Sequence, residues 1–189
     1  MEPGAVLDLF RKSGALLDGH FRLSSGLHSE QYLQCALVLQ YPEFAMQLGD
    51  ALSARTRHLQ PTVVLSPALG GIVIGQEVGR ALGVRALFAE RQDGRLILRR
   101  GFTISSSDRV LVVEDVITTG GSTRETIEVA ASAGADVLGA AAIIDRGSDP
   151  ARVRIPLFSL VQLEVPTYRP ETCPLCAKDV PVVKPGSRA

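Results

Sequence analysis

Short, almost continuously apolar segments recur along this sequence, and they limit its possible folds more than any other feature. They are TVVLS at residues 62–66, VLVV at residues 110–113 and VLGAAAII at residues 137–144. Helical patterns separate them, at residues 72–82 and 121–133. Strands that are apolar on both faces and alternate with helices are typical of a parallel sheet with helices on both sides. The sequence therefore predicts an α/β fold built on such a sheet.

Smaller elements are expected before and after this pattern. Residues 3–17 carry apolar side chains near helical spacing, and Pro42 suits the first turn of a second helix that runs to about His58. Between them, residues 20–34 hold a Ser-Ser-Gly turn between short extended pieces, which predicts a hairpin. A last strand is expected at about residues 157–165.

Residues 84–108 are expected to leave the body of the fold. A strand at residues 84–89 is followed by ERQDGRLILRRGFTISSSD at residues 90–108, a polar and exposed stretch with a hairpin in it.

Composition argues against several classes of protein. The chain has 189 residues, which favours a single domain, and its formal net charge is +0, whereas nucleic-acid-binding proteins usually carry a basic excess. No stretch approaches the ~20 apolar residues of a membrane span. Charged residues interrupt positions 1–20, so a secretory signal is not expected. Three cysteines are too few for a disulfide framework. We expect a cytoplasmic protein that binds neither nucleic acid nor membrane.

Two acids stand at the end of the strand in VLVVEDVITTGGSTRETI, residues 110–127. Burying carboxylates is costly unless something uses them, so Glu114 and Asp115 are candidates for ligand binding. The loop Thr118–Ser122 turns tightly into a helix, whose free N–H groups form a ready anion site. Ser122 and Glu125 have the spacing of a capping box. The expected ligand carries a phosphate and a group, such as a diol, that donates to carboxylates.

Three known kinds of phosphate-binding loop are possible interpretations of this stretch. The nucleotide-triphosphatase loop GxxxxGK[ST] needs a lysine, which is missing here, and the dinucleotide motif GxGxxG is also missing. The third is a ribose-5-phosphate loop. VVEDVITTGGST at residues 112–123 resembles the phosphoribosyl diphosphate signature of the type I phosphoribosyltransferases.

The resemblance is specific to the orotate phosphoribosyltransferases at residues 19–34, 66–79 and 88–102, and together these segments cover most of residues 19–147. It implies one phosphoribosyltransferase-type domain over residues 1–189. Residues 1–40 would contribute to an amino-terminal hood, and residues 166–189 would form a tail that contains proline and cysteine. The CPLC and KPGSR sequences of this tail are similar to one bacterial and archaeal branch of the family.

The resemblance implies transfer of the phosphoribosyl group from phosphoribosyl diphosphate to orotate, with Mg²⁺ and in a homodimer. Glu114 and Asp115 would bind the ribose hydroxyls beside the developing positive charge. The binding residues for phosphoribosyl diphosphate would be Glu114, Asp115, Val116, Ile117, Thr118, Thr119, Gly120, Gly121, Ser122, Leu69, Gly70, Gly71 and Arg91. The magnesium ion would be held mainly by the pyrophosphate.

Four arginines, Arg91, Arg95, Arg99 and Arg100, fall in the polar stretch, where the family has a closing loop. Arg99 and Arg100 would assist catalysis by bringing positive charge. Relatives often carry lysines and a histidine here, and this chain has neither between residues 84 and 110. Because arginine stays protonated, it does not replace a general acid.

Orotate carries a carboxylate, so its site needs a fixed positive group. Arg146 follows the strand at residues 137–144 and is the expected partner, oriented by Asp145, with Thr118 also facing the pyrimidine. Tyr32 either lines this pocket or packs in the core. Ser24 stands where many relatives place a basic residue.

The cysteines Cys173 and Cys176 form half of a four-ligand zinc site. They are either free thiols or part of a site shared across a two-fold dimer. His20, His28 and His58 have no ligand spacing and are expected to be structural or exposed.

Two other functions stay open at this stage. One is a purine phosphoribosyltransferase. The other is a regulator that senses phosphoribosyl diphosphate without catalysis, although a DNA-binding regulator would need a basic recognition module.

Overall fold

A six-stranded sheet forms the body of the computed structural model, which describes residues 1–23, 25–147 and 149–185. The strand order is β5-β4-β3-β6-β7-β8. All neighbours are parallel except the edge strand β5, which pairs antiparallel with β4. The strands are β3 (Val63–Pro67), β4 (Arg85–Gln92), β5 (Arg95–Leu98), β6 (Arg109–Ile117), β7 (Asp136–Asp145) and β8 (Leu157–Gln162).

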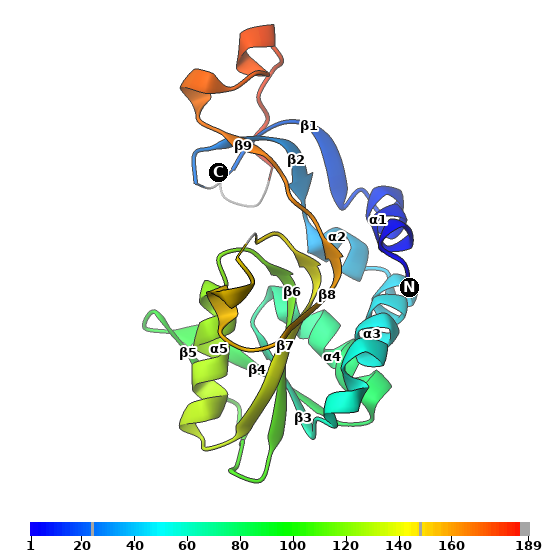
Figure 1. The fold of residues 1–189 in the computed structure, drawn as a ribbon, viewed down its shortest axis with the longest axis vertical. Helices are drawn as coiled ribbons and strands as arrows, with labels where there is room; N and C mark the ends of the chain where they lie inside the picture. Colours follow the sequence, from blue (N-terminus) through cyan, green and yellow to red (C-terminus); the bar gives the residue numbers. More distant parts are fainter. Residues whose placement is uncertain (24, 148, 186–189) are drawn as a thin grey trace.

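Helices cover both faces of this sheet, as predicted (Figure 1). On one face, α3 (Pro42–Thr56) and α4 (Gly70–Leu82) pack against alternate strand residues such as Val64 and Leu111, and α1 (Pro3–Lys12) and α2 (Cys35–Leu39) extend the same core. On the other face, α5 (Gly121–Ser132) packs against the intervening residues, such as Val63 and Val112. The strands are buried on both faces, which explains why they are apolar throughout.

A three-stranded hood stands apart from the body (Figure 1). Its hairpin of β1 (Leu16–Arg22) and β2 (His28–Leu33) confirms the predicted hairpin, and β9 (Thr167–Tyr168) adds a strand from the tail. On the other edge of the hairpin, the amide of Val183 donates to the carbonyl of His20 over 2.8 Å. Both edges of the hairpin therefore contact the carboxyl-terminal part of the chain, at β9 and at Val183.

Several boundaries differ from those predicted. The first helix ends at Lys12 instead of residue 17, because Gly14 adopts φ 69° and the chain enters β1 at Leu16. Helix α2 was not predicted, since five apolar residues are too few to show a helical period. Strand β6 continues through the two acids to Ile117. Among the described residues, short 3-10 helices also occur at Arg57–Leu59, Pro150–Val153, Pro170–Thr172 and Cys176–Lys178.

Within the described ranges, the helices are all too short or too polar to cross a membrane.

Candidate active site

The acid pair lies at the carboxyl end of β6, and its burial changes its proton affinity. Glu114 is only 5% exposed. Desolvation raises the pKa of Glu114 to about 7; the charge of Asp115 adds to the rise, and a hydrogen bond from Ser122 opposes it. Desolvation also raises the pKa of Asp115, whose Oδ1 accepts from the amide of Val116 at 2.8 Å. Two carboxylates with raised pKa values make this strand end a candidate ligand site.

The predicted capping box is wrong. Helix α5 begins at Gly121, and its N-cap is Gly120, at φ 72°. The hydroxyl of Ser122 donates to Oε1 of Glu114 over 2.6 Å, and Glu125 forms an ion pair with Arg91 at 3.0 Å. The amides of the first turn still have no carbonyl partner within the helix, so the anion site at this helix end does not need the box.

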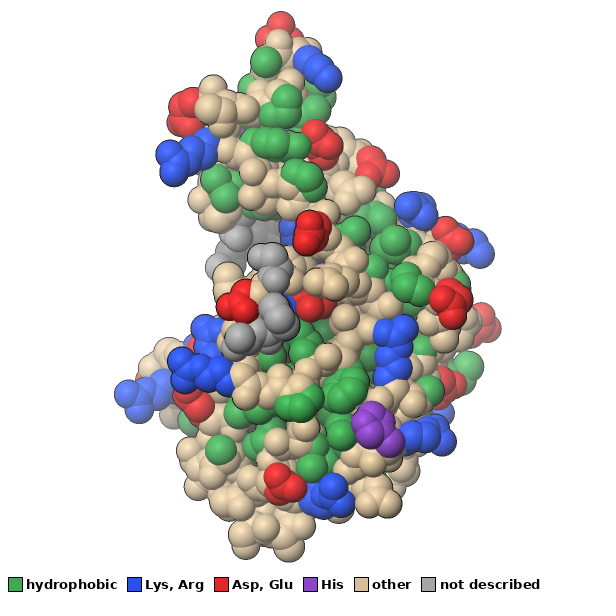
Figure 2. All heavy atoms as spheres, in the orientation of Figure 1, with side chains coloured by type: hydrophobic (Ala, Val, Ile, Leu, Met, Phe, Trp, Pro, Cys, Tyr) green, Lys and Arg blue, Asp and Glu red, His purple; other side chains and the backbone are tan. Residues whose placement is uncertain are grey.

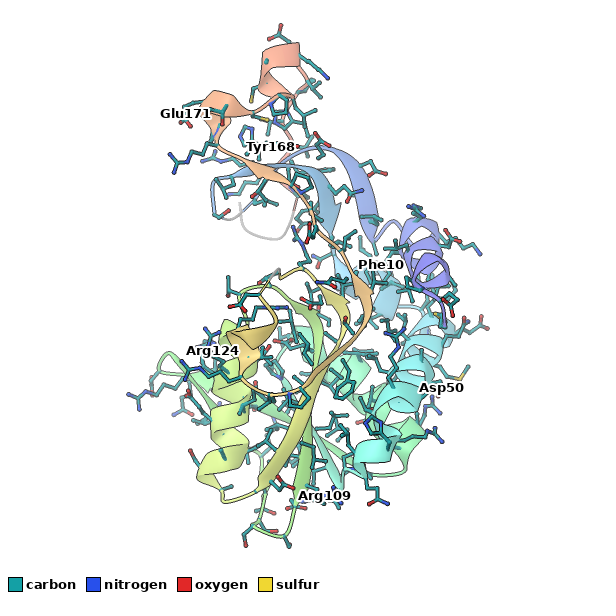
Figure 3. All side chains as sticks on the ribbon, in the orientation of Figure 1. Phe10, Asp50, Arg109, Arg124, Tyr168 and Glu171 are labelled. Carbon is teal, nitrogen blue, oxygen red and sulfur yellow. The ribbon has the colours of Figure 1, made fainter. Side chains whose placement is uncertain are left out.

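Arg124 connects the loop at Thr118–Ser122 to a buried ion pair. Nη1 of Arg124 donates to the carbonyl of Thr119 at 2.9 Å and to that of Arg152 at 2.8 Å (Figure 3 labels Arg124). Arg152 in turn pairs with Asp145 at the end of β7, and both side chains are about nine-tenths buried. Removing one partner of such a pair typically costs about 3–5 kcal/mol. Sequence reasoning missed Arg124 and Arg152, which belong to no local motif.

The turn after β3 contacts the acid pair from the neighbouring strand. A Cβ atom added at Gly70 would lie 2.9 Å from both carboxylate oxygens of Asp115, so any other residue there would displace this carboxylate. Gly71 is similarly confined, with the carbonyl of Val113 3.0 Å from an added Cβ. Leu69, by contrast, is 83% exposed. Helix α4 starts at Gly70, so the amides of Gly70 and Gly71, which have no carbonyl partner within the helix, lie at the same sheet edge as the acids.

A cleft of about 710 Å³ separates the hood from this sheet edge, and Figure 2 shows the molecule hollowed there. Tyr32 lines this cleft, together with Thr118 and Arg146. The other lining residues come mainly from the hood and the tail: Arg22, Leu23, Ser25, Leu33, Gln34, Thr119, Val165, Thr167, Lys184 and Pro185. Arg22 and Lys184 are basic residues that sequence reasoning did not place here.

Arg146 enters the cleft from the end of β7. Its backbone amide donates to the carbonyl of Ile117 at 2.8 Å, which ties the ends of β6 and β7 together. Its Nε is buried and has no hydrogen-bond partner among the residues that the structure describes. Desolvation lowers the pKa of this guanidinium. Asp145 does not orient Arg146, contrary to the prediction, because Asp145 pairs with Arg152 and accepts from the amide of Gly147. An unpaired donor in a cleft suits an anionic ligand.

Comparisons with known proteins agree with this arrangement. The model of the phosphoribosyl transferase domain family matches residues 37–169. An orotate phosphoribosyltransferase of Chlorobium phaeobacteroides (strain BS1) is 50% identical, over 100% of this chain and 98% of the relative. One from Heliobacterium modesticaldum is also 50% identical, over 100% of both chains. The chain belongs to the orotate phosphoribosyltransferase family. The crystal structure of the Aeropyrum pernix orotate phosphoribosyltransferase is 26% identical, with a TM-score of 0.71 over 84% of this chain and 93% of that one.

The four arginines Arg91, Arg95, Arg99 and Arg100 lie on or beside the β4–β5 hairpin, and none is among the described residues that line the cleft. Arg100 pairs with Glu90 at 2.8 Å, and Arg91 pairs with Glu125 on α5. Arg95 lines a separate groove of about 690 Å³ between β5 and α5, and Arg99 is exposed. The structure of one chain therefore does not bring Arg99 and Arg100 to the acid pair.

The other residues predicted for the site differ in what they offer to a ligand. Val116 and Ile117 turn their side chains into the two core clusters and offer only backbone to a ligand. Ser24 lies outside the described residues. Cys173 and Cys176 lie in the tail next to His20 and His28 of the hood.

Proposed function

We propose that this chain transfers the 5-phosphoribosyl group from phosphoribosyl diphosphate to orotate, giving orotidine 5′-monophosphate and pyrophosphate for pyrimidine biosynthesis. The observation that carries the proposal is the 50% identity, over the whole chain, to proteins named orotate phosphoribosyltransferase. The whole of residues 1–189 acts as one unit, because the cleft takes residues from the hood, the body and the tail. Both substrates are anions and do not cross membranes unaided, so we place the reaction in the cytoplasm.

Glu114 and Asp115 hold the ribose in this mechanism. Their carboxylates accept from the 2- and 3-hydroxyls and face the positive charge that develops at C1 when its bond to pyrophosphate breaks. Both groups are buried or partly buried, so water screens this attraction weakly. The hydroxyl of Ser122 favours the ionised form of Glu114, because a donor to a carboxylate lowers its pKa.

The loop from Thr118 to Ser122 binds the 5-phosphate with backbone amides and hydroxyl groups. Arg124 holds the loop through the carbonyl of Thr119, so the amides are positioned before the ligand arrives. The positioned loop holds C1 of the ribose close to the bound base, so the entropy cost of ordering the loop is not added to the reaction barrier.

The turn at Leu69, Gly70 and Gly71 receives the pyrophosphate. Its close approach to Asp115 leaves a cradle that a Cβ would fill, next to hard carboxylate oxygens. Such oxygens, together with phosphate oxygens and water, fit what Mg²⁺ takes in proteins. We propose that the pyrophosphate would hold the ion for the most part, with the Asp115 carboxylate beside it; when bound, Mg²⁺ would neutralise the leaving group's charge.

Orotate occupies the cleft between Thr118 and the hood, with its carboxylate against Arg146. The unpartnered Nε and the partly buried guanidinium support this placement. A planar guanidinium binds a carboxylate through two parallel hydrogen bonds. The N1 atom of orotate then faces C1 of the ribose and forms the new bond as pyrophosphate leaves with the electron pair of the broken C1–O bond. The proton that N1 carried passes to the released pyrophosphate.

We also propose that the enzyme is a homodimer in which the β4–β5 hairpin reaches the neighbouring subunit's site. The support is that the hairpin carries exposed arginines that do not line the cleft of their own chain.

The decisive test measures pyrophosphate release from phosphoribosyl diphosphate with four acceptors: orotate, uracil, adenine and hypoxanthine. We expect orotate to be preferred by at least about 100-fold in kcat/KM, since a site built for a charged group rejects analogues that lack it. Asp115→Asn serves as the inactive control. Turnover with a purine in preference to orotate would establish the purine enzyme instead. Binding of phosphoribosyl diphosphate without turnover of any acceptor would indicate a non-catalytic sensor.

A further inference from the structure

Four side chains with metal-binding atoms meet in the hood, far from the acid pair in sequence. His20 lies on β1 and His28 on β2, while Cys173 and Cys176 come from the tail. One ligand atom from each residue lies within 4.8 Å of all the others. Residues more than 140 positions apart in the sequence thus converge on one point.

The spacing of these atoms is close to that around a zinc ion. Tetrahedral bonds of about 2.0–2.1 Å to nitrogen and 2.3 Å to sulfur place the ligand atoms roughly 3.4–3.8 Å apart. Here Sγ of Cys176 is 3.3 Å from Nδ1 of His28 and 3.8 Å from Nε2 of His20. Sγ of Cys173 is 3.5 Å from the same Nε2. The two nitrogens, 2.8 Å apart, must separate by about half an ångström to admit the ion, and atoms of the cluster that lie up to 4.8 Å apart must approach.

A backbone contact already prepares His20 as a ligand. Its Nδ1 lies 2.7 Å from the carbonyl of Val180, and a carbonyl only accepts, so Nδ1 carries the proton. Nε2 therefore presents its lone pair to the cluster. An imidazole whose outer nitrogen donates to a carbonyl is the usual arrangement around protein-bound zinc.

Three of the four side chains in the cluster are buried. His20, His28 and Cys173 are each 6% exposed or less, while Cys176 is exposed and leaves a path for entry. The tail turns tightly here, with the amide of Ala177 donating to the carbonyl of Cys173 at 3.1 Å. This turn brings both thiols of the CPLC sequence to the same side.

We propose that His20, His28, Cys173 and Cys176 bind one structural Zn²⁺ within a single chain. Two imidazoles and two thiolates are a ligand set typical of zinc, and four protein ligands leave no open position for catalysis. Binding deprotonates both thiols, so two protons are released and the thiolates balance the charge of the ion. The second ligand pair comes from the hairpin of the same chain, so no second subunit has to supply it.

The ion would fix one wall of the substrate cleft. The described tail is also joined to the hood by the two-residue strand β9, by the backbone contact of Val183 with β1, and by hydrogen bonds of Ser29 and Glu30 to the tail. Directly beyond that contact, Lys184 lines the cleft, as does Arg22 from the hairpin. A link between tail and hairpin thus holds two basic residues in place at the cleft. The site itself does not depend on which reaction the cleft performs.

The first experiment measures zinc in the full-length protein, expressed with added zinc and purified under reducing conditions without chelator. We expect about one zinc per chain in the wild type, and less than about 0.2 in Cys176→Ser, which changes an exposed ligand and leaves the core intact. His58→Gln and Cys35→Ala are the matched controls: they change a histidine and a cysteine outside the cluster, and both should keep the full zinc content.

The second experiment uses the unmodified protein, so it does not depend on any variant folding. Treatment with a strong chelator should lower Tm by roughly 5–10 °C, and added zinc should restore it. Trypsin should cleave after Lys178, which lies two residues beyond the ligand Cys176, at least about tenfold faster in the chelated protein. Cys176→Ser should respond to neither treatment.

Three results would overturn the site. The first is a wild type that contains no zinc and takes none up in competition with a chelator. The second is loss of zinc in His58→Gln equal to that in Cys176→Ser. The third is a Cys173–Cys176 disulfide in the freshly purified protein. None of these readouts uses turnover, so a failure of the zinc site is distinguishable from a failure of the proposed reaction.

Discussion

Glu114 should cost the folded protein stability above neutral pH. Its pKa is about 7 in the folded protein, against an ordinary value of 4.5. Between these values the folded chain keeps a proton that the unfolded chain has released, so unfolding becomes easier as pH rises. The stabilising contribution is complete below about pH 4.5 and is lost as pH rises through 7. At 1.4 kcal/mol for each factor of ten, the whole cost is about 3 kcal/mol.

Glu114→Gln removes this pH dependence with little change of shape. The amide oxygen still accepts from Ser122, and no charge has to be desolvated. Between pH 5.5 and 8.5 the free energy of unfolding of the variant should rise by about 2 kcal/mol relative to the wild type. For a chain of this size that corresponds to roughly 4–8 °C in Tm. Turnover should collapse at every pH, because an amide does not balance the ribosyl cation.

Urea denaturation of both proteins at pH 5.5, 7 and 8.5 measures the effect, with Glu128→Gln as the control. Glu128 is an exposed carboxylate on α5, so its variant should run parallel to the wild type. A constant difference between Glu114→Gln and the wild type across this range would refute the reasoning. So would a variant that is less stable than the wild type at pH 8.5.

Three further predictions concern the cleft, the acid pair and the dimer. Arg146→Ala should raise KM for orotate about tenfold or more, through loss of a charged hydrogen bond of ~1.5–3 kcal/mol, and should change KM for phosphoribosyl diphosphate much less; equal changes in both would contradict its role. Ser122→Ala should move the acidic limb of the pH profile of kcat/KM upward by about one pH unit, because its hydrogen bond lowers the pKa of Glu114; an unmoved limb would count against that contact. Mixed dimers of inactive Asp115→Asn and inactive Arg99→Ala chains should recover part of the activity, whereas fully active monomers in sedimentation would rule out a shared site.

Local sequence patterns were sufficient to predict the sheet and the helices that form the body of the fold. The alternation of apolar strands and helices reflects burial on both faces of a parallel sheet, which is a property of each segment taken alone. The location of Glu114 and Asp115 followed from the same pattern, since parallel strands end at one edge. Arg146 could be placed at that edge for the same reason, and the structure does bring it into the cleft beside Thr118.

Local sequence patterns did not predict the contacts between segments that are far apart in the sequence. His20 and Cys173 are 153 residues apart, and no spacing rule joins a hairpin histidine to a tail cysteine. The two-residue strand β9 is too short to show alternation, yet it is what brings the tail to the hood. Asp145 shows the same limit. Its neighbour in sequence, Arg146, was the expected partner, but Asp145 forms its ion pair with the buried Arg152.

The partner of Ser122 shows why a local motif can identify the right loop and the wrong contact. A serine at a helix start usually caps a backbone amide, which stabilises by about 1 kcal/mol, and water can satisfy the same amide when the cap is missing. A buried carboxylate such as Glu114 has no such substitute, and a hydrogen bond to a charged group contributes about 1.5–3 kcal/mol. The hydroxyl therefore goes to the acid, 2.6 Å away, and the helix amides stay available. The loss of the capping box thus leaves more donors for a phosphate than the motif itself would have done.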